Sequence, residues 1–262
     1  MADVSYRPIM EDWVWSYSRL ESYNNCPYAF FCHYILKEDE EPMFYSSIGS
    51  FVHEILRGYL SGEYDEEEML SRFMIGFGDN VDGFRPPEST VDKYINSVLK
   101  FLDGFHGFNL ETIAVEKYVL FEINGIKMQG YIDYIGKDKD GKIYIIDHKS
   151  RELKPRSNRK KPTAKDAELD EMLKQLYIYA EAVKSEYGEY PSYLCFNCYR
   201  NGEFIVEPFL EEKYKEVCDR VSKDVNLVMD EDRFCPSEEF YKCRYLCGYN
   251  KDCVYHQSNI RK

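Results

Sequence analysis

The chain has 262 residues, enough to bury a substantial core in one domain, which we expect to span residues 1–262. Aromatic residues make up 16 % of it, with 24 tyrosines, a composition unlike that of disordered chains. The formal net charge is −13, and no apolar stretch approaches the roughly 18 residues that cross a bilayer. These features argue against a disordered or membrane-spanning chain and indicate a folded, acidic domain.

Helices are expected to dominate the N-terminal section, residues 16–110. Apolar residues at helical spacing, bounded by turn residues, predict helices at 16–36, 49–60, 65–75 and 90–102. Ser16 or Ser18 opens the first helix, and Pro27 should break or kink it. The turn-rich segment 76–87 separates the last two helices.

Strands and helices alternate through residues 111–209, which we expect to form the core of the domain. Strands are predicted at 112–123, 126–135, 142–149, 192–199 and 203–208, with turns at Gly141 and at Asn201-Gly202. A long amphipathic helix at 166–187 ends at Gly188. A further helix at 210–229 and a cysteine-rich tail complete residues 210–262. The expected fold is α/β, with a central mixed β-sheet flanked by helices.

Two acids and a lysine lie at the ends of two of these strands. Side chains alternate faces along a strand, so Asp147 and Lys149 share one face while His148 points to the other. An antiparallel hairpin would place Asp133 beside Asp147. Adjacent carboxylates repel each other unless a cation shares them, and their hard oxygens suit Mg²⁺ or Mn²⁺. An isolated D-x-K triplet is also common by chance, so the surrounding residues must show whether this one marks a metal site.

Three further motifs occur in order around this pair. Gly49-x-x-x-His53 places a histidine on a predicted helix, and Gln175-x-x-x-Tyr179 puts two polar side chains on one helical face. With G-x-I-D at Asp133 and D-x-K after it, this set resembles the PD-(D/E)XK nuclease superfamily. Within that superfamily it is similar to the RecB-like branch, which includes the AddB nuclease domain and the CRISPR-adaptation iron–sulfur nucleases. The resemblance covers about residues 16–256.

The resemblance implies a restriction-endonuclease-like core and an Mg²⁺- or Mn²⁺-dependent deoxyribonuclease, an exonuclease in preference to an endonuclease. Its metal ligands would be His53, Asp133, Asp147 and the backbone carbonyl of His148. In such a site a water beside the metal attacks the phosphate in line and leaves a 5′-phosphate. Glu116 stands where relatives often carry an acid, but we expect it to lie behind the ligands rather than to bind the metal.

The same resemblance assigns the remaining catalytic residues. Lys149 would orient the attacking water and stabilise charge in the transition state. Gln175 and Tyr179 would position the DNA backbone and the catalytic lysine. Without the resemblance, we would interpret a lone histidine on a helix as a structural residue. The same holds for a glutamine and a tyrosine on a helix surface.

Nine cysteines add a second pattern. The first fifteen residues lack a signal peptide, so we expect a cytoplasmic location, in a prokaryotic or phage-infected cell, and free thiols. Cys195-x-x-Cys198 lies in a predicted strand and reads as two buried thiols. Cys32 and Cys218 read as core residues on helix faces.

The four other cysteines of interest are one N-terminal and three clustered near the C-terminus: Cys26, Cys243, Cys247 and Cys253. In the resembled branch, one N-terminal and three C-terminal cysteines hold a [4Fe-4S] cluster. The first two clustered cysteines are usually two residues apart there, whereas three separate them here. Four thiolates could instead hold tetrahedral Zn²⁺, and Cys235 is a spare ligand.

Positive charge is concentrated directly after Lys149. Residues 151–165 contain seven basic residues against one acidic residue, a net charge of +6, so the rest of the chain carries −19. Prolines and polar residues predict an irregular loop there, which is either a solvated linker or a contact for DNA phosphates without sequence readout. The DNA-binding candidates in it are Arg151, Lys154, Arg156, Arg159, Lys160 and Lys161.

Two other hypotheses remain open from sequence. One is a binding module that grips single-stranded DNA or duplex ends inside a recombination complex, and the other is a zinc-stapled nuclease. The intact set of acids, lysine and histidine favours the enzyme. No G-x-x-x-x-G-K-[ST] motif occurs, so any ATP-driven unwinding would come from a helicase or recombination protein in another chain. The expected context is DNA recombination, DNA repair or phage DNA processing.

Overall fold

A five-stranded mixed sheet forms the centre of the protein. The computed structural model describes residues 5–251, 253 and 256. Strand order is β1-β2-β3-β4-β5, with β3 and β4 parallel and the other neighbours antiparallel. The strands are β1 (Glu111–Ile123), β2 (Ile126–Lys137), β3 (Ile143–Lys149), β4 (Tyr193–Cys198) and β5 (Glu203–Pro208). The predicted mixed sheet and the five strand positions are confirmed.

Two of the turns depend on glycine. Gly141, between β2 and β3, has φ +81°, and Gly202, between β4 and β5, has φ +69°. Residues with a Cβ rarely adopt this left-handed conformation, so the two glycines allow tight antiparallel connections. The parallel pair β3 and β4 needs a long crossover, which the basic loop and α7 (Ala164–Tyr187) supply.

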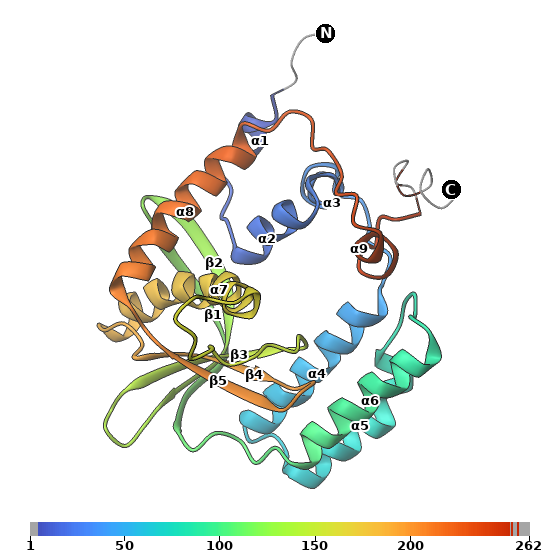
Figure 1. Cartoon of the computed structure of the whole chain (residues 1–262), viewed down its shortest axis with the longest axis vertical. Helices are drawn as coiled ribbons and strands as arrows, with labels where there is room; N and C mark the ends of the chain where they lie inside the picture. Colours follow the sequence, from blue (N-terminus) through green and yellow to red (C-terminus); the bar gives the residue numbers. More distant parts are fainter. Residues whose placement is uncertain (1–4, 252, 254–255, 257–262) are drawn as a thin grey trace.

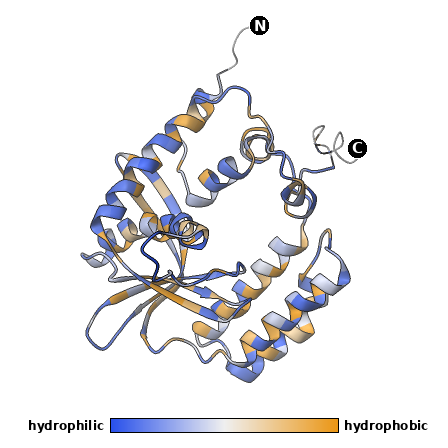
Figure 2. Ribbon diagram, viewed as in Figure 1, coloured by the Kyte–Doolittle hydropathy of each residue, from blue (hydrophilic) through white to orange (hydrophobic). Residues whose placement is uncertain are grey.

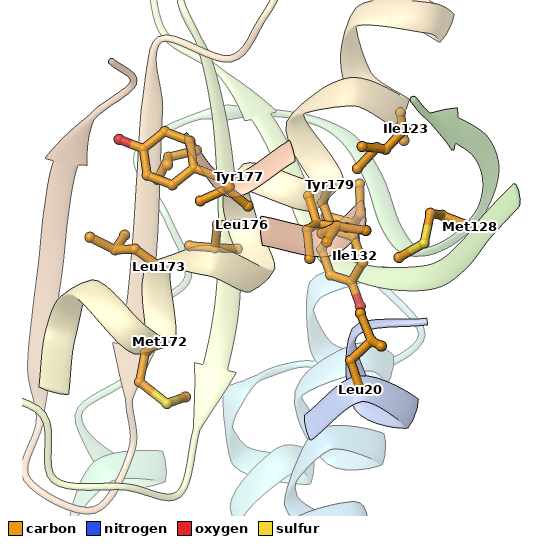
Figure 3. Close-up of a cluster of buried hydrophobic side chains, with 14 of the residues drawn as sticks. Leu20, Ile123, Met128, Ile132, Met172, Leu173, Leu176, Tyr177 and Tyr179 are labelled. Carbon is orange, nitrogen blue, oxygen red and sulfur yellow. The ribbon is translucent and has the colours of Figure 1, made fainter. Parts of the chain in front are cut away.

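The α7 helix packs along one face of the sheet, with α8 (Glu211–Met229) and α2 (Tyr17–Asn25) beside it (Figure 1). Figure 3 shows side chains of α7, strand β2 and α2 meeting in this core, including Leu176, Ile132 and Leu20. All three side chains are at most 5 % exposed. Figure 2 shows hydrophilic residues spread along the outer helix α8. This core fixes α7 against the strands that carry the acids.

A three-helix layer lies at the other side of the sheet (Figure 1). It consists of α4 (Phe44–Leu60), α5 (Glu66–Asn80) and α6 (Glu88–Asp103). These helices share a separate buried cluster, which Tyr199 at the end of β4 joins to the sheet. The layer therefore sets the position of His53, which lies on α4.

Helix α5 runs farther than expected. Its sequence suggested an end at residue 75, with a turn-rich segment from 76, but the helix continues to Asn80. A Cβ at Gly76 would lie 2.8 Å from the ring of Phe51 on α4, so this glycine allows the two helices to approach closely. Gly76 therefore serves helix packing rather than a turn, and the predicted boundary is wrong for that reason. Helix α4 also begins earlier than residue 49, at Phe44.

The first predicted helix is broken where Pro27 suggested. Ser16 caps α2 by accepting a hydrogen bond from the Arg19 N–H. Cys26 is extended (φ −160°) and separates α2 from α3 (Pro27–Phe30), which continues into the π-helical turn η1 (Phe31–Leu36). Short helices α1 (Arg7–Met10) and α9 (Phe240–Tyr245) had no clear sequence signal. No helix in the described part of the chain is long and apolar enough to span a membrane.

Candidate active site

Asp133 and Asp147 meet where β2 and β3 diverge. The β2–β3 ladder ends at the pair Tyr134 and Ile146, and the two aspartates are the next positions in that register. Beyond this point the His148 N–H donates to Asp133 Oδ2 at 2.7 Å. The carboxylate thus takes the place of the backbone carbonyl that a continued ladder would supply. The hairpin expected from the sequence thus places both acids at one end of the ladder.

Lys149 lies between an acid of the sheet and a glutamine of α7. Its Nζ is 2.8 Å from Asp147 Oδ2 and donates to Gln175 Oε1 at 2.6 Å. The alternation along β3 therefore places Asp147 and Lys149 on the α7 side. Asp147 Oδ2 is buried, and no described group gives it a hydrogen bond of ordinary geometry. The ion pair with Lys149 is its main compensation.

Gly130 of the G-x-I-D motif makes room for Tyr179. A Cβ at Gly130 would lie 2.6 Å from the Tyr179 ring, so only glycine lets that ring lie over β2. Burial, with smaller contributions from Asp147 and Asp133, raises the pKa of the Tyr179 phenol. Two sequence motifs that are far apart in the chain are thus fitted to each other beside the acids.

His53 and Glu116 approach the same acid from the other side. His53 Nδ1 lies 3.5 Å from Asp133 Oδ2. Ligand atoms of His53, Glu116 and Asp133 all lie within 4.8 Å of one another. Glu116 has φ +48°, a left-handed conformation within β1, at the level of Asp133 in the β1–β2 register. The expectation that Glu116 stands behind the ligands is therefore corrected, because its backbone turns the carboxylate into the group.

The ionisation of this group fits cation binding. Burial first, and then the Asp147 charge, raise the pKa of Asp133 well above its usual value, although the His148 N–H opposes this. Burial also raises the pKa of Glu116, against the nearby Arg57 charge. Burial lowers the pKa of His53, which favours the neutral imidazole that binds metals. Two destabilised carboxyls and a neutral histidine form a donor set that a divalent cation would stabilise.

The His148 ring faces the opposite side of the sheet, as predicted. Its Nδ1 is 2.9 Å from Asn197 Nδ2 on β4, and its ring stacks on Phe108 with centroids 6.1 Å apart. Burial lowers the pKa of His148 well below its usual value, so the ring is neutral. Asn197 was not anticipated, since nothing in its own strand reveals that the parallel register puts it opposite His148.

The sequence profile of the PD-(D/E)XK nuclease superfamily matches residues 14–254. The chain belongs to the PD-(D/E)XK nuclease superfamily. Similar solved structures include a candidate exonuclease from Eubacterium rectale, with 11 % identity, 94 % of this chain and 90 % of that chain covered, and a TM-score of 0.49. Another is SSO0001, with 18 % identity, 90 % and 94 % coverage, and a TM-score of 0.30. No curated protein matches the chain.

The basic loop of this PD-(D/E)XK chain is irregular from Arg151 to Thr163, as predicted. Arg156 is bound on two sides, to Glu207 and Asp170, both at 2.8 Å. Lys154 lies 3.4 Å from Glu203. These two cations therefore hold the loop onto β5 and α7. Of the six DNA-binding candidates, those without an acidic partner among the described residues are Arg151, Arg159, Lys160 and Lys161.

The N- and C-terminal cysteines converge, although more than 200 residues separate them. Cys26, Cys243 and Cys247 line one cavity of about 350 Å³. They lie at or next to α3 and α9, which are labelled in Figure 1. Cys253 lies close enough that its charge contributes to the raised pKa values of Cys243 and Cys247, of which burial is the main cause. Cys195, Cys198, Cys32 and Cys218 are buried core residues, as expected, and Cys235 is exposed.

Proposed function

We propose that this PD-(D/E)XK chain is a deoxyribonuclease of the RecB-like branch that uses Mg²⁺ or Mn²⁺ and acts as an exonuclease. One observation carries the proposal. The donor group of His53, Glu116 and Asp133 lies next to the linked set Asp147, Lys149 and Gln175. Such a group suits a hard divalent cation, which would polarise the scissile phosphate when bound.

Each side chain has a role in this scheme. Asp133, Glu116 and the neutral His53 would hold the cation, together with Asp147 and the His148 backbone carbonyl. Lys149, already held by Asp147 and Gln175, would orient the attacking water and stabilise the charge that develops on the phosphate. Gln175 contacts the lysine from helix α7, and Gln175 and Tyr179 would position the DNA backbone and the lysine. Arg151, Arg159, Lys160 and Lys161 would bind DNA phosphates.

The cysteine cavity is proposed to hold a [4Fe-4S] cluster as a structural staple. A single tetrahedral zinc with Zn–S bonds of about 2.3 Å needs sulfurs roughly 3.8 Å apart. No three of the thiols that the structure describes lie within 4.8 Å of one another. A four-metal cluster is larger than one zinc ion and does not require that spacing. Such a cluster would link the N-terminal section to the tail.

Digestion of end-labelled DNA tests the proposal. Wild-type protein, purified without air, is incubated with single-stranded and duplex DNA in Mg²⁺, in Mn²⁺ and in EDTA. We expect cleavage in both metals, none in EDTA, and mononucleotide or short products that carry 5′-phosphates. A protein that binds DNA but cuts none in any metal would instead be a DNA-end-binding subunit, which could act with a helicase or recombination protein.

A further inference from the structure

The outer face of the β1–β2 hairpin exposes three large apolar side chains. Tyr118, Leu120 and Tyr131 are 48 %, 64 % and 56 % exposed. The alternate residues of β1, such as Val119 and Phe121, point into the core and are buried. The alternation is therefore regular, and the exposed side chains form one patch on the solvent face rather than a disrupted core.

The two tyrosines of this patch are held as a pair. Tyr118 lies opposite Tyr131 in the β1–β2 register, and their ring centroids are 5.3 Å apart. The Tyr118 hydroxyl donates to Gln129 Oε1 at 3.0 Å. Cross-strand contact and this hydrogen bond orient the rings before any ligand arrives. The pair offers aromatic surface on a rigid part of the sheet.

The pair lies beside the proposed metal donors. Glu116 and Asp133 are each two residues away along the same strands. At about 3.3 Å per residue, the tyrosine pair is roughly 7 Å along the hairpin from the donors. Lys117, between Glu116 and Tyr118, points to the opposite face, where it pairs with Glu186 of α7 at 2.7 Å. The tyrosines are thus on the side from which His53 approaches.

An open groove lies at His53 and Glu116, two of the proposed metal donors. It has a volume of about 420 Å³, and its walls are Glu116 of β1 and the α4 residues Gly49, Ser50, His53, Glu54 and Arg57. A DNA strand with a phosphate at the donors would have the tyrosine pair about one nucleotide away, roughly 7 Å along the hairpin. Aromatic faces bind unpaired bases by stacking and are tolerant of sequence, whereas paired bases in a duplex hide their faces.

We propose that Tyr118 and Tyr131 form a stacking platform for unpaired bases next to the site of cleavage, so that the substrate is a single strand or a frayed end. The inference rests on the proposed nuclease function and adds the class of substrate to it. The tyrosines would recognise bases, whereas cations elsewhere would bind phosphates.

Binding of fluorescent oligonucleotides tests this, with Ca²⁺ in place of Mg²⁺. The probes are a single strand, an abasic strand with the same phosphates, and a blunt duplex. Tyr118→Ala/Tyr131→Ala should weaken single-strand binding about 10-fold or more and leave the weaker abasic binding unchanged. Tyr118→Phe/Tyr131→Phe should retain wild-type affinity. Phe204→Ala, at another exposed ring on β5, is the matched control and should bind normally.

Two results would overturn the platform. One is unchanged single-strand affinity in the double alanine variant, and the other is an equal loss on the abasic strand. The nuclease proposal is judged separately, by cleavage with Mg²⁺. If wild type cleaves DNA and the alanine pair binds like wild type, the platform is wrong and the nuclease stands. If wild type cleaves nothing, the nuclease is wrong whatever the platform does.

Discussion

Glu116 shows how a single backbone conformation assembles the acids of the site. Strand alternation was enough to place Asp147 with Lys149, because that rule needs only local sequence. The left-handed φ of Glu116 breaks the regular strand, and a glutamate in the sequence does not predict this conformation. Asn197 was missed for a different reason, since its contact with His148 depends on a parallel register set by a distant helix.

The buried acids make the stability of the metal-free protein depend on pH. The pKa of Asp133 is raised in the folded state, so the native protein holds this proton to higher pH than the unfolded chain. The stability that this carboxyl contributes is thus present at low pH and lost as pH rises through the raised pKa. In EDTA, Asp133→Asn should raise the melting temperature at about pH 8 more than at about pH 4.

Addition of Mn²⁺ should make the wild type, rather than Asp133→Asn, the more stable protein. The wild type should then gain stability because the cation binds only the folded state, whereas the asparagine variant should gain little. Thermal melts with and without the metal provide the measurement. A shift that is the same at both pH values and in both conditions would mean that Asp133 is not part of a strained cation site.

The fit between Gly130 and Tyr179 can be tested with one methyl group. Gly130→Ala should displace the Tyr179 ring, destabilise the protein by about 1–3 kcal/mol and reduce cleavage, because the new Cβ has no room. Denaturant unfolding and a digestion assay would measure both effects. Gly78→Ala is the matched control. Its Cβ meets nothing within 4 Å in α5, so it should be neutral or stabilising by up to about 1 kcal/mol. A Gly130→Ala protein as active as wild type would refute the fit.

At the scale of elements, most helices and strands follow from hydrophobic period and turn residues. The boundaries that differ have local causes. Helix α7 begins at Ala164 rather than at residue 166, because Thr163 and Asp166 form a capping box. The Thr-x-x-Asp pattern resembles the usual S/T-x-x-E/Q signal and could have located this start. The end of helix α5 could not be predicted in this way. In a sequence, a glycine such as Gly76 can indicate either a turn or a close contact between helices.

The basic loop contains two kinds of cation, and variants should separate them. Arg159→Ala/Lys160→Ala/Lys161→Ala should weaken binding to all DNA sequences alike and reduce the salt slope by up to ~0.7–0.9 per lost phosphate contact. Arg156→Ala should instead lower the melting temperature, because Arg156 connects the loop to Glu207 and Asp170. Affinity measured over a salt series distinguishes these results. An unchanged slope in the triple variant would mean that the loop is a linker.

At the scale of the whole molecule, the cavity between α3 and α9 joins the two ends of the chain. The pattern of one distant and three clustered cysteines was visible in the sequence, but only the fold shows that Cys26 shares a cavity with Cys243 and Cys247. Ser237 strengthens this contact, since its N–H donates to Cys26 Sγ at 3.4 Å. A cross-link here would close a span of more than 200 residues.

Removal of one thiol should therefore weaken the link between the N-terminal section and the C-terminal tail. Cys26→Ser should abolish the brown colour and the bound iron of anaerobically purified protein and lower its stability by several kcal/mol, on the order of 4–5 by the chain-entropy model. Metal analysis and thermal melts measure the two effects. Cys235→Ser should keep the iron, because that exposed thiol is outside the cavity. Zinc without iron in wild type would contradict the cluster.

The most direct test of the catalytic assignment is digestion of end-labelled DNA by Lys149→Ala, compared with wild type at equal DNA occupancy. Lys149 contacts both Asp147 and Gln175, so its loss should remove catalysis while the remaining cations keep DNA bound. Lys154→Ala, a surface lysine paired with Glu203, is the control and should cut normally. We predict cleavage at least about 100-fold slower in Lys149→Ala, with DNA affinity within about threefold of wild type. Wild-type cleavage rates in a folded Lys149→Ala protein would contradict the account.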